Sequence, residues 1–141
     1  MGKEFDPIPT AEGWQLSNAP VFTMAVHNAS LEIFDTAGME ALTAKSKILT
    51  AYLQFVIEKA LVQNNAISLQ IITPHQRGCQ ISMLTGDNGK SVFEHLTRAG
   101  IIADWREPNV IRIAPVPLYN SFEDVYRFGQ ALSEFGKQNA S

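Results

Sequence analysis

Apolar side chains recur every three to four residues through the first half of the chain, which is the spacing of one helix face. This spacing predicts a helix over residues 21–37 and a longer helix over residues 39–62, with Gly38 as the break between them. Residues 2–16 contain prolines and glycines but no apolar period, so we expect an extended arm there. The segment 17–20, Ser-Asn-Ala-Pro, places a polar cap before a first-turn proline and predicts the start of the first helix.

The second half of the chain changes to an alternating pattern, which is typical of short strands with one buried face. The predicted strands are residues 67–72, 80–84, 101–104 and 110–114. A short helix over residues 92–99, closed by Gly100, is predicted between the second and third strands. Ser121, with Asp124 three residues later, resembles a capping box and predicts a last helix. This order gives an α+β domain with helices packed on one face of a small, mainly antiparallel sheet.

Composition narrows the class of protein. The chain has 141 residues, is 45% hydrophobic and 18% charged, and carries a formal net charge of -3. That length suits one domain, and mild acidity argues against a nucleic-acid surface. The lone Cys79 excludes an internal disulfide and favours a reducing compartment. No run approaches the roughly 18 apolar residues of a membrane span. We therefore expect a soluble, cytoplasmic domain with neither nucleic-acid nor membrane partners.

Few residues of the sequence are candidates for binding a metal or an anion. The three histidines, His27, His75 and His95, stand apart from one another and from Cys79, so the spacing predicts no metal site. Ser17 and Asn18 lie at a predicted helix start, where free N–H groups and the positive end of the helix dipole attract phosphate or carboxylate. A simple capping role for these two residues remains the alternative.

Arg112 is the most informative charged residue. It lies within the apolar run Val110-Ile-Arg-Ile-Ala114, and a guanidinium in such a strand requires a partner. Its planar fork suits bidentate binding of a carboxylate. The sequence leaves open whether that carboxylate belongs to a ligand or to one of the chain's own acids. Arg77, next to Gly78 in a predicted loop, is interpreted as a solvated surface charge.

Several segments resemble the kynureninase family. Members of this family are pyridoxal-phosphate-dependent hydrolases of tryptophan catabolism. The segments are Gly13-Trp-Gln-Leu-Ser-Asn-Ala-Pro20, Ala29-Ser-Leu-Glu-Ile-Phe-Asp35, Lys45-Ser46 with Leu49-Thr50 and Tyr52-Leu53, Arg77-Gly-Cys-Gln80, and Arg106-Glu-Pro-Asn-Val-Ile-Arg-Ile-Ala-Pro-Val-Pro-Leu-Tyr-Asn-Ser-Phe122. The resemblance extends from about Phe5 to Phe128 and implies the C-terminal small domain of a fold type I pyridoxal-phosphate enzyme. It implies an arm or connection over residues 1–18 and the small domain over residues 19–141.

The resemblance also implies a function. Kynureninases hydrolyse L-kynurenine or 3-hydroxykynurenine to anthranilate or 3-hydroxyanthranilate and L-alanine. Arg112 matches the arginine that binds the substrate α-carboxylate, and Asn18, with Ser17 beside it, matches an asparagine near the cofactor and the substrate's aromatic end. The lysine that forms the Schiff base with pyridoxal 5'-phosphate has no counterpart here, so we expect no catalytic residue in this chain and no activity from it alone. A homodimer is expected for the full-length enzyme.

Two other interpretations remain open at this point. The chain resembles, more distantly, the small domains of other fold type I pyridoxal-phosphate enzymes, such as cysteine desulfurases or aminotransferases. A free-standing α+β module that holds a small carboxylate with Arg112 and the Asn18 helix end is the second interpretation. The sequence does not decide between kynurenine and 3-hydroxykynurenine as the preferred substrate.

Overall fold

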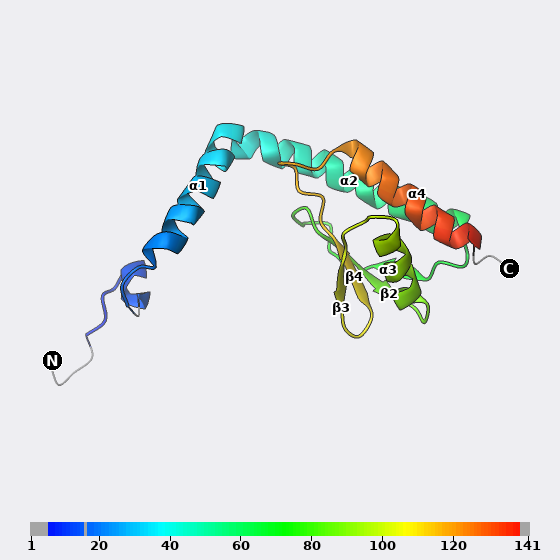
Figure 1. Ribbon diagram of the computed structural model, residues 1–141, viewed down its shortest axis with the longest axis horizontal. Helices are drawn as coiled ribbons and strands as arrows, with labels where there is room; N and C mark the ends of the chain where they lie inside the picture. The colour runs from blue at the N-terminus through cyan, green and yellow to red at the C-terminus, as the bar shows by residue number, and fades with distance from the viewer. Residues whose placement is uncertain (1–5, 16, 139–141) are drawn as a thin grey trace. The chain divides into compact units, whose positions relative to one another are not determined.

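The computed structural model in Figure 1 describes residues 6–15 and 17–138. The chain divides into two compact units, one up to Ala37 and the other from Gly38 onward. The first unit holds a short 3-10 helix, η1 (Ala11–Trp14), and helix α1 (Val21–Ala37), which buries none of its residues. The larger compact unit thus starts after α1. The division into an arm over residues 1–18 and a small domain over residues 19–141 stays a prediction.

The start of α1 differs from the prediction. The helix begins at Val21, and the carbonyl of Pro20 accepts its first bond, from the N–H of Met24 at 2.9 Å. A residue that precedes proline is disfavoured in helical backbone, so the helix cannot extend back through Ala19. Ser17 and Asn18 therefore precede the helix, and their predicted capping role is wrong, although the range of the helix is confirmed.

The second unit is an α+β domain, as predicted. Its elements are α2 (Met39–Gln63), β1 (Leu69–Ile71), β2 (Ile81–Thr85), α3 (Gly89–Arg98), β3 (Asp104–Arg106), β4 (Val110–Ile113) and α4 (Phe122–Gln138). The strands form one four-stranded sheet in the order β1-β2-β4-β3. This order makes β2 and β4 the inner strands, and every neighbouring pair is antiparallel.

The helices cover one face of this sheet (Figure 1). The inner strands direct alternate side chains into the core, namely Ile81, Met83, Ile111 and Ile113, all of them buried. These residues pack with the buried residues of α2, α3 and α4. The side chains between them, on the other face, are less buried, as expected for a sheet with one covered face.

Helices α2 and α4 lie side by side over the core (Figure 1). Gly129 of α4 makes this close approach possible, because a Cβ at that position would lie 2.1 Å from Cγ1 of Val56 in α2. A glycine in a helix interior is otherwise unfavourable, so its presence here follows from the helix contact.

The third strand is displaced from its predicted position. Residues 101–103 are not in a strand, and the first of them, Ile101, is bonded to the end of α3. The N–H of Gly100, with φ +80°, bonds to the carbonyl of Thr97, and the N–H of Ile101 bonds to that of Leu96. This pair of bonds is a Schellman motif, and it holds Ile101 against the helix. The strand β3 therefore begins only at Asp104.

The predicted capping box at the start of α4 is confirmed. The hydroxyl of Ser121 accepts a bond from the N–H of Asp124 at 3.2 Å, and Oδ2 of Asp124 accepts from the N–H of Ser121 at 2.7 Å. The bond from the backbone N–H of Ser121 is the main cause that holds the pKa of Asp124 below its usual value, and the bond from the Ser121 hydroxyl lowers this pKa further.

Ser121→Ala is expected to destabilise the chain by about 1 kcal/mol at neutral pH, because the backbone N–H of Asp124, in the first turn of α4, loses the hydroxyl that accepts its hydrogen bond. The pKa of Asp124 should rise only part of the way to its usual value, since the backbone bond remains. Because the pKa of Asp124 is lower in the folded chain than its unfolded value of 3.8, this carboxyl stabilises the folded chain at a pH above 3.8. The contribution is lost as the pH falls through the folded-state pKa. Urea unfolding and an NMR titration of Asp124 test this; an unchanged pKa would contradict it.

Candidate functional site

Arg112 lies in the middle of the sheet on its open face. Its strand, β4, is hydrogen-bonded on both sides, and its cross-strand neighbours are Ser82 of β2 and Asp104 of β3. Because Ile111 and Ile113 point into the core, the side chain of Arg112 emerges on the face without helices. Its side chain is 31% exposed, so a ligand can reach it.

Arg112 has an acidic partner within its own unit. Its Nε and Nη2 both contact Oδ2 of Asp104, and Nε of Arg106 donates to the same oxygen at 2.9 Å. The ion pair that the sequence left open is therefore formed. It does not use the whole guanidinium, because no bond joins Nη1 of Arg112 to an acceptor among the described residues.

The two arginines change the acidity of Asp104. The bond from Arg112 is the main cause that holds the pKa of this carboxyl below its usual value, and Arg106 adds to the effect. Asp104 is therefore ionised throughout the neutral range, and the ion pair is lost only as the pH falls through that lowered value. Together the three charged groups carry a net charge of +1, which favours an anion.

Ser17 and Asn18 are exposed residues of the first unit, as is Trp14, which is 86% exposed. They belong to a different compact unit from Arg112. The joint action of Arg112, Ser17 and Asn18 in one site therefore stays a prediction.

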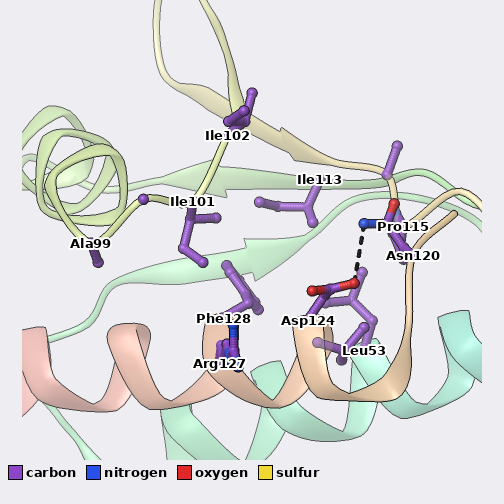
Figure 2. A pocket seen from close by; sticks show the side chains of 13 residues that line it. Leu53, Ala99, Ile101, Ile102, Ile113, Pro115, Asn120, Asp124, Arg127 and Phe128 are labelled. Atoms are coloured by element: carbon purple, nitrogen blue, oxygen red, sulfur yellow. Dashed lines mark hydrogen bonds between the residues drawn. The ribbon is translucent and has the colours of Figure 1, made fainter.

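A cavity of about 360 Å³ lies on the other side of the sheet from Arg112 (Figure 2). Its walls come from the end of α3, the end of β4 and the first turns of α4. Ile101, Ile113 and Phe128 make it apolar, and Asp124 at its edge bonds to Asn120. Arg112 does not line this cavity. It offers packing space, and both charged side chains in its lining already have partners: Nε of Arg127 donates to Glu123 at 3.1 Å, and Asp124 is used by the helix cap.

Arg77 is not the solvated charge that the sequence indicated. Its Nη2 donates to Oε1 of Gln54 at 2.6 Å, and its Nη1 donates to the carbonyl of Pro74 at 3.4 Å. The side chain thereby joins the loop between β1 and β2 to helix α2. A structural role accounts for it.

The lysines of the described chain do not suit a cofactor aldehyde. A lysine used in this way is activated by burial or by a neighbouring cation. Lys45 is half-buried, but its Nζ donates to the carbonyl of Pro117 at 2.7 Å. The other lysines in residues 6–15 and 17–138 are exposed, and Lys90 lies over the ring of Trp105. The described residues alone therefore do not fit pyridoxal phosphate.

Residues 6–15 and 17–138 offer neither a metal-binding cluster nor a membrane-spanning helix. These residues contain no group of three or more His, Cys, Asp or Glu side chains that could hold a metal ion. Within the same ranges, no helix has both the length and the apolar character needed to cross a bilayer.

Comparison with solved structures places the fold. The chain is similar to an acetylornithine aminotransferase from Elizabethkingia anophelis, with a TM-score of 0.66 and 18% identity, over 90% of this chain and 32% of that one. The architecture is thus that of the fold type I class to which aminotransferases belong.

Sequence comparison gives the family. The family model for the kynureninase C-terminal domain matches residues 42–132. A kynureninase from Christiangramia forsetii is 49% identical over 95% of this chain and 32% of its own length. One from Xanthomonas oryzae pv. oryzae is 52% identical over 91% and 31%. The chain belongs to the kynureninase family, and it spans about a third of the length of these relatives.

Sequence reasoning missed Asp104 as the partner of Arg112. The available signal was the turn sequence Glu107-Pro108-Asn109, which follows Asp104-Trp-Arg106 and precedes the apolar run that starts at Val110. A hairpin centred on Pro108 pairs residue 104 with residue 112, as observed. Because the third strand was predicted over residues 101–104 and not at Asp104–Arg106, this pairing register was not apparent from the sequence.

Proposed function

We propose that this chain recognises the substrate carboxylate in a kynureninase, an enzyme that hydrolyses L-kynurenine to anthranilate and L-alanine, or 3-hydroxykynurenine to the corresponding products. The observation that carries the proposal is the position of Arg112, half-exposed on the open face of the sheet with Nη1 unbonded among the described residues. The family relationship supplies the context.

Arg112 performs this role through two properties. The side chain presents fixed N–H donors that match the two oxygens of an α-carboxylate. The strand that carries it is held on both sides, so a carboxylate bound there has a defined position relative to the sheet. Holding the substrate by its non-reacting end orients the bond that is to be cleaved.

The cofactor and partners follow from the same proposal. Pyridoxal 5'-phosphate, when bound, supplies the electron-withdrawing system that carbon–carbon cleavage needs. Residues outside this chain would hold it in the main, because the described lysines do not fit it. Asn18 is proposed to lie near the cofactor and the aromatic end of the substrate, with Ser17 beside it. The intact enzyme is proposed to be a cytoplasmic homodimer, in which the segment with Asn18 contributes to the neighbouring subunit's site.

The intact enzyme that contains this chain is expected to release anthranilate from L-kynurenine. The purified 141-residue chain is expected to have no activity, because none of the lysines in residues 6–15 and 17–138 is suited to bind the cofactor aldehyde. Anthranilate fluorescence, recorded with added pyridoxal phosphate, measures both. Cysteine and acetylornithine serve as comparison substrates for the desulfurase and aminotransferase alternatives. Turnover by the chain alone, or a preference of the intact enzyme for either comparison substrate, would contradict the proposal.

A further inference from the structure

The side chains around Arg112 divide its guanidinium into an occupied edge and an open edge. Nε and Nη2, which form the side edge, both contact Oδ2 of Asp104. Nη1 and the second hydrogen of Nη2 form the end edge, and this edge is bonded to no acceptor among residues 6–15 and 17–138. Two parallel N–H donors at that edge match a carboxylate.

Asp104 is itself held in a fixed place. It is the cross-strand partner of Arg112, and its side chain lies on the same face of the sheet. Oδ2 also accepts a bond from Arg106 two residues further along β3, so the carboxylate is fixed from two sides. An arginine side chain has many rotamers, and a fixed acceptor at one edge removes most of that freedom before a ligand binds.

We propose that Asp104 is a positioning residue that turns the open edge of Arg112 toward the substrate carboxylate. This inference rests on the proposed function of Arg112. Asp104 contacts Arg112 rather than the substrate, and it acts by orientation. Its negative charge opposes the binding of an anion, but both groups are partly exposed, so solvent screens that repulsion.

The opposite role would be competition, in which Asp104 occupies Arg112 until the substrate displaces it. The two roles predict opposite signs for the same variant. If Asp104 positions Arg112, its removal weakens the binding of a carboxylate. If Asp104 competes, its removal strengthens that binding, because a competing anion has been lost.

The test uses Asp104→Asn in the intact enzyme, with Asp104→Ser as a second variant should the first not fold. Asp87→Asn is the matched control, because it makes the same charge change at an exposed turn residue. We expect Asp104→Asn to raise KM for L-kynurenine about tenfold, the effect of one hydrogen bond to a charged group, and to leave kcat nearly unchanged. Inhibition by L-alanine should weaken similarly, whereas inhibition by L-alaninamide, which lacks the carboxylate, should not change.

The double variant Arg112→Ala with Asp104→Asn separates positioning from a general structural role. We expect Asp104→Asn to have no further effect once Arg112 is absent, because the two residues act as one unit. A lower KM in Asp104→Asn, an equal effect on L-alaninamide, or an equal effect with and without Arg112 would overturn the inference while leaving the clamp intact. An unchanged KM in Arg112→Ala alone would instead overturn the clamp itself, and the role of Asp104 with it.

Discussion

Replacing Arg112 by alanine in the intact enzyme is expected to lower kcat/KM for L-kynurenine about 100-fold, chiefly through KM. The variant removes the donors proposed for the substrate carboxylate and leaves Asp104 on the open face without one of its two arginines. Arg112→Lys keeps the charge but loses the planar fork, so it should recover only part of the loss. Steady-state kinetics with anthranilate detection measures these effects.

Arg106→Ala is the matched control for this experiment. Arg106 carries the same charge and bonds to the same oxygen of Asp104, but it lies on the edge strand and its side chain is 60% exposed. Because Arg106 supplies only a second, solvated contact to Asp104 and none to the substrate, we expect its removal to lower kcat/KM slightly, by no more than about threefold. An equal loss in both variants would indicate general attraction of an anion, and an unchanged kcat/KM in Arg112→Ala would exclude the clamp.

Leu53→Ala is expected to produce the largest loss of stability, a decrease in the free energy of unfolding of about 2–5 kcal/mol. Leu53 is fully buried in α2 and borders the cavity at the start of α4, so the removed methyl groups enlarge an existing space. Urea unfolding of the 141-residue chain measures the change.

Ile48→Ala is the control on the same helix. The Ile48 side chain is 62% exposed, so its truncation should change the free energy of unfolding by less than about 0.5 kcal/mol. Equal effects at the two positions would contradict the core assignment, because burial would then not determine the cost.

The long, regular elements could be predicted from the sequence because their own residues determine them. Helix α2 matches its prediction to within one residue, since its apolar stripe continues over the whole length. The capping box at Ser121 was equally visible, because both of its residues lie within one turn. Local patterns of this kind need no knowledge of the rest of the fold.

Features that depend on two distant or competing signals could not be predicted. The apolar run before β3 fits a strand and a helix end equally well, and only the Schellman bonds of Gly100 and Ile101 decide between them. The pairing of Arg112 with Asp104 depends on hairpin register, which that error concealed. At Ser17 and Asn18, the polar residues favoured a cap, but Pro20 determined where the helix begins.

The inner position of β4 has a mechanical consequence. The backbone at Arg112 is joined to β2 on one side and β3 on the other, so it cannot shift by itself without breaking both ladders. Any large displacement of the backbone at Arg112 must therefore move β2 and β3 with it, while small adjustments are limited to side-chain torsions. A spectroscopic label on β2 or β3 would then report the same movement as one placed beside Arg112.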